Sequence, residues 1–180
     1  MVAALFFMMA GCVQSVSKPA VERRGVRFDA AHFKWHAFYS ECGQTLGCTV
    51  LYANRVQRRD DDKVMTGRLR EDVLTRTPSV EIGIRNFPDP AVVTWTSKDG
   101  TNHREVVDIR QIFRDEVVMH RVPSSDVDGV TESPVILLIV DDRTIRIYMK
   151  VRVRLKYEEV VGNPYSKYRD ELTLAFQKTY

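Results

Sequence analysis

The stretch that decides the fold runs from Ile145 to Leu155 and reads IRIYMKVRVRL. Apolar residues occupy every second position, and each position between them is basic or tyrosine. A period of two places all the apolar side chains on one face of a β-strand, whereas a helix would scatter them around its circumference. We therefore expect a half-buried strand whose apolar face is a wall of the core. The other face, here called the cationic stripe, carries Arg146, Tyr148, Lys150, Arg152, Arg154 and, just beyond, Lys156.

The segments around this strand also have strand character. Residues 134–140, PVILLIV, are apolar without alternation, which is typical of a strand covered on both faces, and residues 141–144 supply a turn into the stripe strand. Asp99-Gly100 favours a hairpin between residues 91–97 and 104–109. Further strands are expected at residues 26–28, 33–37, 49–56, 79–87, 116–122 and 172–177.

One helix and two polar loops complete the expected organisation. Met65, Leu69 and Val73 recur every fourth residue, which predicts a short helix over residues 62–74. Residues 58–63 and 123–133 are rich in polar and turn-forming residues and are expected to be loops. This pattern predicts an all-β fold, an antiparallel, immunoglobulin-like β-sandwich with at most one short helix.

Length and charge limit the classes of protein. A chain of 180 residues with 28% charged residues fits one domain, which we place at residues 25–180. The net charge of +3 is too small to indicate a nucleic-acid partner.

Residues 2–10 form an uncharged apolar run that ends in Met9-Ala10-Gly11-Cys12. The run is too short to cross a bilayer and indicates a secretory signal peptide; the alternative is a short apolar leader of a cytosolic protein. Small residues before a cysteine resemble the lipobox of bacterial lipoproteins. The resemblance implies that residues 1–11 are removed and that Cys12 is acylated. It also implies a chain on the periplasmic face of a membrane, the outer one because Val13 is not the retention-marking Asp, with residues 12–24 as a flexible tether.

The two other cysteines, Cys42 and Cys48, lie six residues apart with Gly43 and Gly47 between them. In an oxidising periplasm they are expected to form a disulfide that closes a small loop. A metal-binding pair or a redox pair is the alternative, although both favour the tighter C-x-x-C spacing. We expect no metal and no cofactor.

Catalytic motifs are missing from the sequence. The histidines His32, His36, His103 and His120 form no metal-binding motif, and no serine stands in G-x-S-x-G. A triad dispersed along the chain, such as Asp108, His103 and a loop serine, remains an alternative. We predict that the chain is not an enzyme.

Three interpretations of the cationic stripe remain open. Residues 134–140 contain no acid, so no charge from that neighbouring strand is expected to neutralise the stripe. The stripe is then a solvated face approached by Glu158, Glu159, Asp170 or Glu171, a docking surface for an acidic protein partner, or a surface attracted to anionic lipid or cell-wall polymer.

In architecture and location the chain is similar to immunity lipoproteins that neutralise type VI secretion lipase effectors, and to accessory lipoproteins of envelope machines. The resemblance implies a non-catalytic, lipid-anchored periplasmic protein that holds or neutralises a protein partner. An accessory component of an envelope or secretion machine is the first alternative, and a module that binds a membrane or cell-wall surface is the second.

Overall fold

The computed structural model describes residues 27–180 except residues 71, 76–80 and 131–132. The predicted signal peptide at residues 1–11, the tether at residues 12–24 and the predicted lipid attachment at Cys12 lie outside the described residues.

Strands dominate the described residues, with one single-turn α-helix. The strands are β1 (Arg27–His32), β2 (Trp35–Gly43), β3 (Thr45–Tyr52), β4 (Arg55–Arg59), β5 (Glu81–Arg85), β6 (Ala91–Ser97), β7 (Asn102–Val107), β8 (Val117–His120), β9 (Val127–Val130), β10 (Val135–Asp141), β11 (Thr144–Leu155) and β12 (Tyr168–Thr179). The helix α1 spans Ile109–Ile112, and two 3-10 turns span Ser124–Asp126 and Pro164–Lys167. None of these helices is long and apolar enough to cross a membrane.

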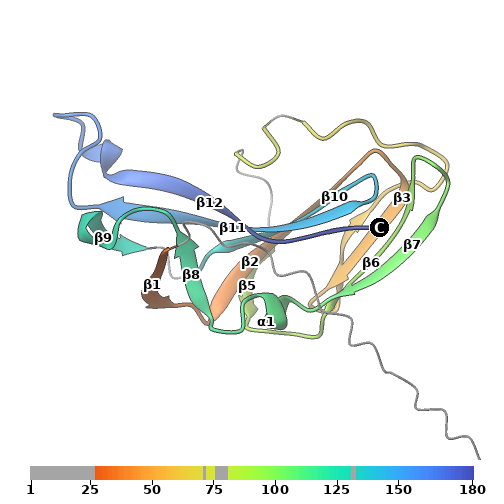
Figure 1. The fold of residues 1–180 in the computed structure, drawn as a ribbon, viewed down its shortest axis with the longest axis horizontal. Coiled ribbons are helices and arrows are strands. Elements are labelled where there is room, and N and C mark those ends of the chain that lie inside the picture. Colours follow the sequence, from red (N-terminus) through yellow and green to blue (C-terminus); the bar gives the residue numbers. More distant parts are fainter. Residues whose placement is uncertain (1–26, 71, 76–80, 131–132) are drawn as a thin grey trace, which may run out of the picture.

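The strands form three sheets. One has the order β12-β11-β10-β2-β5, with β9 beside β11; a second has the order β4-β3-β6-β7; β1 and β8 form a separate pair. In Figure 1 the four-stranded sheet stands at one end of the longer sheet, and β1 and β8 lie near the other end. Buried side chains from all three sheets form one continuous core, so the all-β, sandwich-like fold predicted from the sequence is confirmed.

The strand that decided the fold is β11. Its six apolar side chains, from Ile145 to Leu155, are each at most 2% exposed, as the period of two predicts. The preceding turn reverses the chain at Asp142, whose φ is 51°, and pairs β10 with β11 from Asp141↔Thr144 to Val135↔Lys150.

One strand pair departs from the antiparallel prediction. β10 runs parallel to β2, with Val135 opposite Ala37 and Asp141 opposite Gly43. Parallel strands are usually covered on both faces. The unbroken apolar run of β10 fits this position, because its residues from Ile136 to Val140 are each at most 2% exposed.

The helix predicted over residues 62–74 is wrong. The described residues between 60 and 75 instead form an irregular segment, here called the strap, which crosses the six-stranded sheet (yellow in Figure 1). The Thr66 N–H donates to the Thr45 carbonyl at 2.8 Å, and the Gln44 N–H donates to the Gly67 carbonyl at 2.9 Å. These long-range bonds replace the local bonds that a helix would make.

Both predicted polar loops are partly wrong. Residues 123–133 contain the 3-10 turn Ser124–Asp126 and β9, which pairs with the end of β11. Arg58 and Arg59, expected in a solvated loop, belong to β4 and pair with β3. In both places hydrogen bonds to a strand distant in the sequence outweigh the local preference for a loop.

Candidate functional site

The inner half of the cationic stripe consists of Arg146, Tyr148 and Lys150, and two of these residues contact the strap. Leu137 and Ile139 of β10 form a second apolar cluster on this face of the sheet with Val73 of the strap, and Tyr148 packs against them. Burial raises the pKa of Tyr148. The Lys150 ammonium donates to the Thr75 carbonyl at 2.8 Å. The strap of the same chain therefore covers the aliphatic surface beside the stripe.

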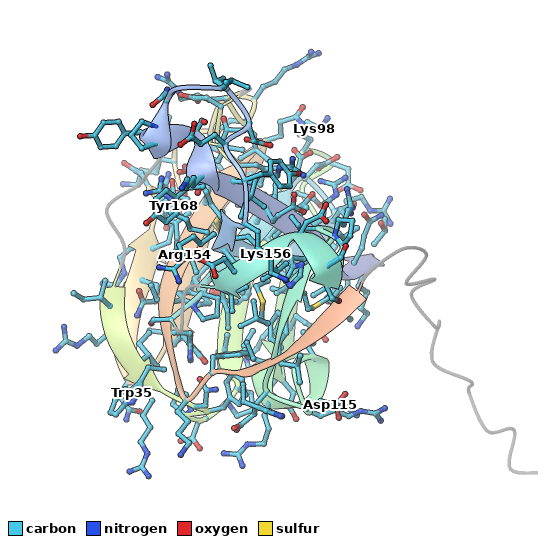
Figure 2. All side chains as sticks on the ribbon, turned by 90° about the vertical axis from the view of Figure 1, so that its left-hand side faces the viewer. Trp35, Lys98, Asp115, Arg154, Lys156 and Tyr168 are labelled. Atoms are coloured by element: carbon cyan, nitrogen blue, oxygen red, sulfur yellow. A yellow bond between two sulfur atoms is a disulfide. The ribbon has the colours of Figure 1, made fainter. Side chains whose placement is uncertain are left out.

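The outer half of the stripe remains accessible. The Arg152 and Arg154 side chains are 62% and 52% exposed, and Lys156 is also exposed. These side chains lie beyond the last β10–β11 pair, where β12 and β9 flank β11, and Figure 2 shows Arg154, Lys156 and Tyr168 at the end of the molecule that faces the viewer. Tyr168 is directly opposite Arg154 in the β11–β12 ladder. The exposed surface thus combines arginine with tyrosine, two residue types enriched at binding hot spots.

Acids from three neighbouring strands pair with the arginines of the stripe. Arg146 lies 3.5 Å from Asp141 of β10, Arg152 lies 3.0 Å from Asp170 of β12, and Arg154 lies 2.8 Å from Asp128 of β9. The expectation that no acid of the strand before the stripe neutralises it is wrong, because β10 extends one residue beyond the apolar run to Asp141. The hydrogen bond that Arg152 donates to Asp170, together with the charge of that carboxylate, raises the pKa of Arg152.

These ion pairs also hold the outer side chains in place. Arg152 and Arg154 each use their Nε atom for the contact with an aspartate, and the Lys156 ammonium donates to the Ser125 carbonyl at 2.9 Å. The outer half of the stripe therefore presents exposed cationic side chains that are oriented by contacts within the chain.

The structure does not assemble the dispersed triad. Asp108 caps helix α1, where its carboxylate accepts from the Gln111 N–H at 3.0 Å. His103 instead contacts Ser97, whose hydroxyl lies 2.9 Å from His103 Nε2 and donates to Asp99 Oδ1 at 2.5 Å. A hydrolytic triad needs an exposed serine that donates to histidine, with the acid at the other ring nitrogen. Here Ser97 is 1% exposed and is itself the group that contacts the acid.

His103 has a packing role in the described structure. Its ring stacks on Trp95 with centroids 4.7 Å apart, and Tyr180 contacts both rings edge-on. The Trp95 indole N–H donates to the Asp142 carbonyl at 2.7 Å. This aromatic cluster packs β6 and β7 against the residue after β12 and bonds β6 to the turn before β11.

His32 and His36 lie on different strands and are not a ligand pair. His36 is fully buried, with Nδ1 2.8 Å from Asn86 Oδ1 and Nε2 2.9 Å from the Tyr52 hydroxyl. Burial lowers the pKa of His36, although the Asn86 contact opposes this effect. His36 is therefore a neutral core histidine with partners at both ring nitrogens.

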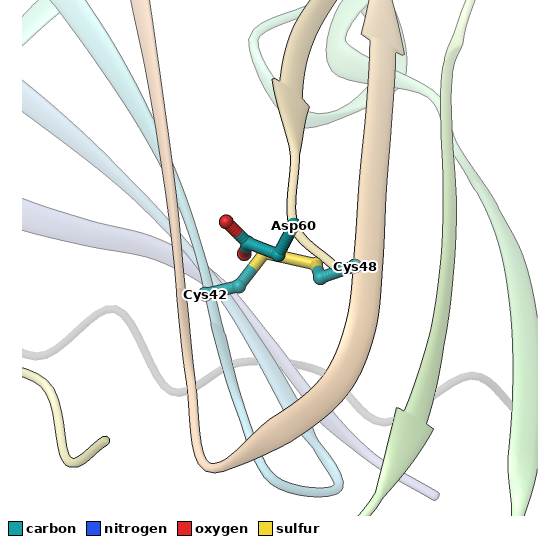
Figure 3. Close-up of side chains that lie close together, drawn as sticks. All are labelled: Cys42, Cys48 and Asp60. Carbon is teal, nitrogen blue, oxygen red and sulfur yellow. A yellow bond between two sulfur atoms is a disulfide. The ribbon is translucent and has the colours of Figure 1, made fainter. Parts of the chain in front are cut away.

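The predicted disulfide between Cys42 and Cys48 is present and joins β2 of the six-stranded sheet to β3 of the four-stranded sheet (Figure 3). A carboxylate oxygen of Asp60 and both sulfur atoms lie within 4.8 Å of one another. Both sulfur atoms are used in the disulfide, so neither is a thiolate that could ligate a metal. Asp60 also accepts from Arg58 Nε at 2.8 Å.

A second exposed surface lies at the turn between β11 and β12, and the sequence reasoning missed it. We call residues 157–168 the hairpin tip. The signal available in the sequence was Val160-Val161 directly before Gly162-Asn163-Pro164, an apolar pair next to turn-forming residues.

Comparisons of the chain with protein-family models, curated proteins and solved structures find no match.

Proposed function

We propose that this chain is a non-catalytic binding protein of the bacterial envelope, held at the membrane by a lipid on Cys12, which holds or neutralises a protein partner. The observation that carries the proposal is the outer half of the cationic stripe: Arg152, Arg154 and Lys156 are exposed and yet fixed by Asp170, Asp128 and the Ser125 carbonyl. Side chains that are already ordered lose less conformational entropy on binding. Guanidinium groups bind carboxylates with a matching, bidentate geometry, which favours an acidic partner surface.

Two further observations support a binding role at this location. The Cys42–Cys48 disulfide is the kind of cross-link that persists in an oxidising compartment. The contact that joins Ser97, His103 and Asp99 has the buried serine at its centre. That order of contacts favours a structural role for Ser97 rather than catalysis.

The first experiment reverses the charge of the outer stripe. The tagged chain is expressed in its own host with Arg152→Glu and Arg154→Glu, and co-purified proteins are identified by mass spectrometry. The partner recovered with the parent chain should be lost or at least tenfold reduced. The control is Arg59→Glu with Arg104→Glu, two exposed arginines on the four-stranded sheet, which should leave recovery unchanged.

Stability is measured in parallel, because the same substitutions break two ion pairs. Exposed ion pairs contribute about 0–1 kcal/mol each, so the melting temperature should fall by only a few degrees. If partner recovery is unchanged and the melting temperature alone shifts, the outer stripe is structural and the proposed docking surface is wrong.

The second experiment tests the anchor. Cys12→Ala should move the chain from the membrane fraction to the soluble fraction, and the lipid mass should disappear from the N-terminal peptide. The absence of a lipid mass on the Cys12 peptide of the parent chain would contradict attachment through that residue.

A further inference from the structure

The hairpin tip lies at one end of the molecule (Figure 1) and has several exposed apolar side chains. Val161 is 95% exposed, Tyr165 86% and Val160 59%. Tyr157 and Tyr168, at the base of the tip, are 43% and 48% exposed. Apolar side chains therefore stand at the end of the hairpin, with tyrosines around them.

The backbone of the tip is hydrogen-bonded within itself. The Gly162 N–H donates to Glu158 Oε2 at 2.9 Å, and the Asn163 N–H donates to the Val160 carbonyl at 3.0 Å. The Ser166 hydroxyl contacts the Val160 N–H at 3.0 Å and donates to the Asn163 carbonyl at 2.7 Å. The backbone N–H groups of Val160, Gly162 and Asn163 thus have partners within the tip, which lowers the cost of moving them to surroundings with less water.

The charges of the tip are balanced. Glu158 lies 3.9 Å from Lys167, and Glu159 accepts from Arg169 Nε at 2.8 Å. With Arg169, which lies one residue beyond the tip, residues 157–169 carry no net charge. Binding through this surface would depend on apolar contact and only weakly on salt.

The position of the tip suits a membrane contact. β9 pairs with the last residues of β11 immediately before the tip, and Ala31 and His32 of β1 line the same hollow as Val127–Val130 of β9. The strand that follows the tether therefore lies at the same end of the molecule as the tip. Residues 13–26 span at most about 50 Å when fully extended, so a lipid on Cys12 would allow this end to reach the bilayer.

We propose that the hairpin tip inserts Val160, Val161 and Tyr165 into the interfacial region of a lipid bilayer, with Tyr157 at the level of the headgroups. Tyrosine is enriched at that level, and apolar side chains below it gain from leaving water. A protein partner is less favoured, because the tip is convex and narrow, whereas a stable interface buries about 800 Å² on each side. The inference rests on the membrane location in the proposed function and adds a second contact with the bilayer.

The test uses a fluorescent label at the tip of the full chain. In a Cys12→Ala background with the disulfide intact, Val161→Cys supplies the one free thiol, which is labelled with the environment-sensitive dye NBD. Vesicles of phosphatidylethanolamine and phosphatidylglycerol (3:1) should shift its emission to the blue and raise its intensity at least twofold. Raising the salt from 0.1 M to 0.5 M should change the bound fraction less than twofold.

The matched control carries the same label at Val106→Cys in β7, a residue that is 48% exposed on the four-stranded sheet. Its emission should not respond to vesicles, and because both labelled chains contain the same N-terminal residues, binding through those residues cannot produce the difference. Replacing Val160 and Val161 by serine should weaken vesicle binding about fivefold or more.

Three results would overturn the inference. They are an equal response of both labels, no response at position 161, and binding that is lost on adding salt. Loss of a co-purified protein in the serine variant, with vesicle binding unchanged, would assign the tip to a protein partner. The vesicle assay uses a chain without an attached lipid and contains no protein partner. A negative result in this assay therefore argues against insertion of the tip, and says nothing against the anchor at Cys12 or docking through Arg152 and Arg154.

Discussion

Leu69 occupies the space in which a side chain at position 43 would stand. A Cβ placed on Gly43 would lie 2.5 Å from Leu69 Cγ and 3.0 Å from the Leu69 backbone nitrogen. Gly43 ends β2, and Leu69 belongs to the strap that covers Leu137 and Ile139. Because Gly43 has no side chain, the strap can cross the sheet closely at this position, with Leu69 against the backbone of Gly43.

The first prediction follows from this contact. Gly43→Ala should displace the strap and lower the free energy of unfolding by about 1–3 kcal/mol, the usual cost of overpacking. Urea unfolding followed by tryptophan fluorescence measures the change. The control is Gly67→Ala in the strap itself, where no atom lies within 4 Å of the added Cβ. That variant should be unchanged or up to about 1 kcal/mol more stable, and an equal loss in both variants would contradict the assigned contact.

A second prediction concerns the cross-link between the two sheets. Replacing Cys42 and Cys48 by serine should lower the free energy of unfolding by about 2 kcal/mol, the chain-entropy value for so short a loop. In the parent chain, a comparison of thermal unfolding with and without reductant measures the stability that is lost when this disulfide is reduced. Cys12→Ala should respond to reductant as the parent does, because its Cys42–Cys48 bond is unchanged. If reductant has no effect on the parent chain, the disulfide does not contribute to stability.

Local patterns predicted the strands well and the contacts between distant segments poorly. The period of two in β11 and the unbroken apolar run of β10 are properties of a few neighbouring residues, and both strands are where the sequence placed them. The strap has a helical spacing in Met65, Leu69 and Val73, yet its backbone pairs with β3, about 20 residues away in the sequence.

The acids that pair with the stripe depend on strand register, which the sequence does not show. Asp170 is opposite Arg152 because of the β11–β12 ladder, and Asp128 reaches Arg154 because β9 joins the other edge of β11 beyond the end of β10. The sequence analysis named Asp170 as one acid that could approach the stripe, but it did not name Asp128, because nothing near the stripe in the sequence indicates that β9 pairs with β11.

A third prediction concerns Tyr180. Its ring contacts Trp95 and His103, its N–H donates to the Arg143 carbonyl at 2.9 Å, and the Lys178 ammonium lies 4.4 Å from its ring centre. Tyr180→Ala should lower the free energy of unfolding by about 1–3 kcal/mol, because the aromatic contact between β12 and β6 is lost. Tyr165→Ala, which removes an 86% exposed tyrosine, should change stability by no more than about 0.5 kcal/mol. Equal effects of the two variants in chemical denaturation would show that the Tyr180 ring does not join the strands energetically.

The fourth prediction is a pH dependence of stability caused by His36. Burial lowers the pKa of this histidine in the folded chain, whereas in the unfolded chain the pKa stays near 6.5. As the pH falls below 6.5, the unfolded chain binds a proton that the folded chain does not, so the free energy of unfolding decreases by up to about 1.4 kcal/mol per pH unit. Above about pH 7.5 both forms are neutral and the effect vanishes. His36→Gln keeps hydrogen-bonding groups near Asn86 and Tyr52 but cannot titrate, so its stability should vary less between pH 7.5 and 5.5 than that of the parent. The exposed His32→Gln variant should keep the parent's slope, and an unchanged slope in His36→Gln would show that another group causes the loss.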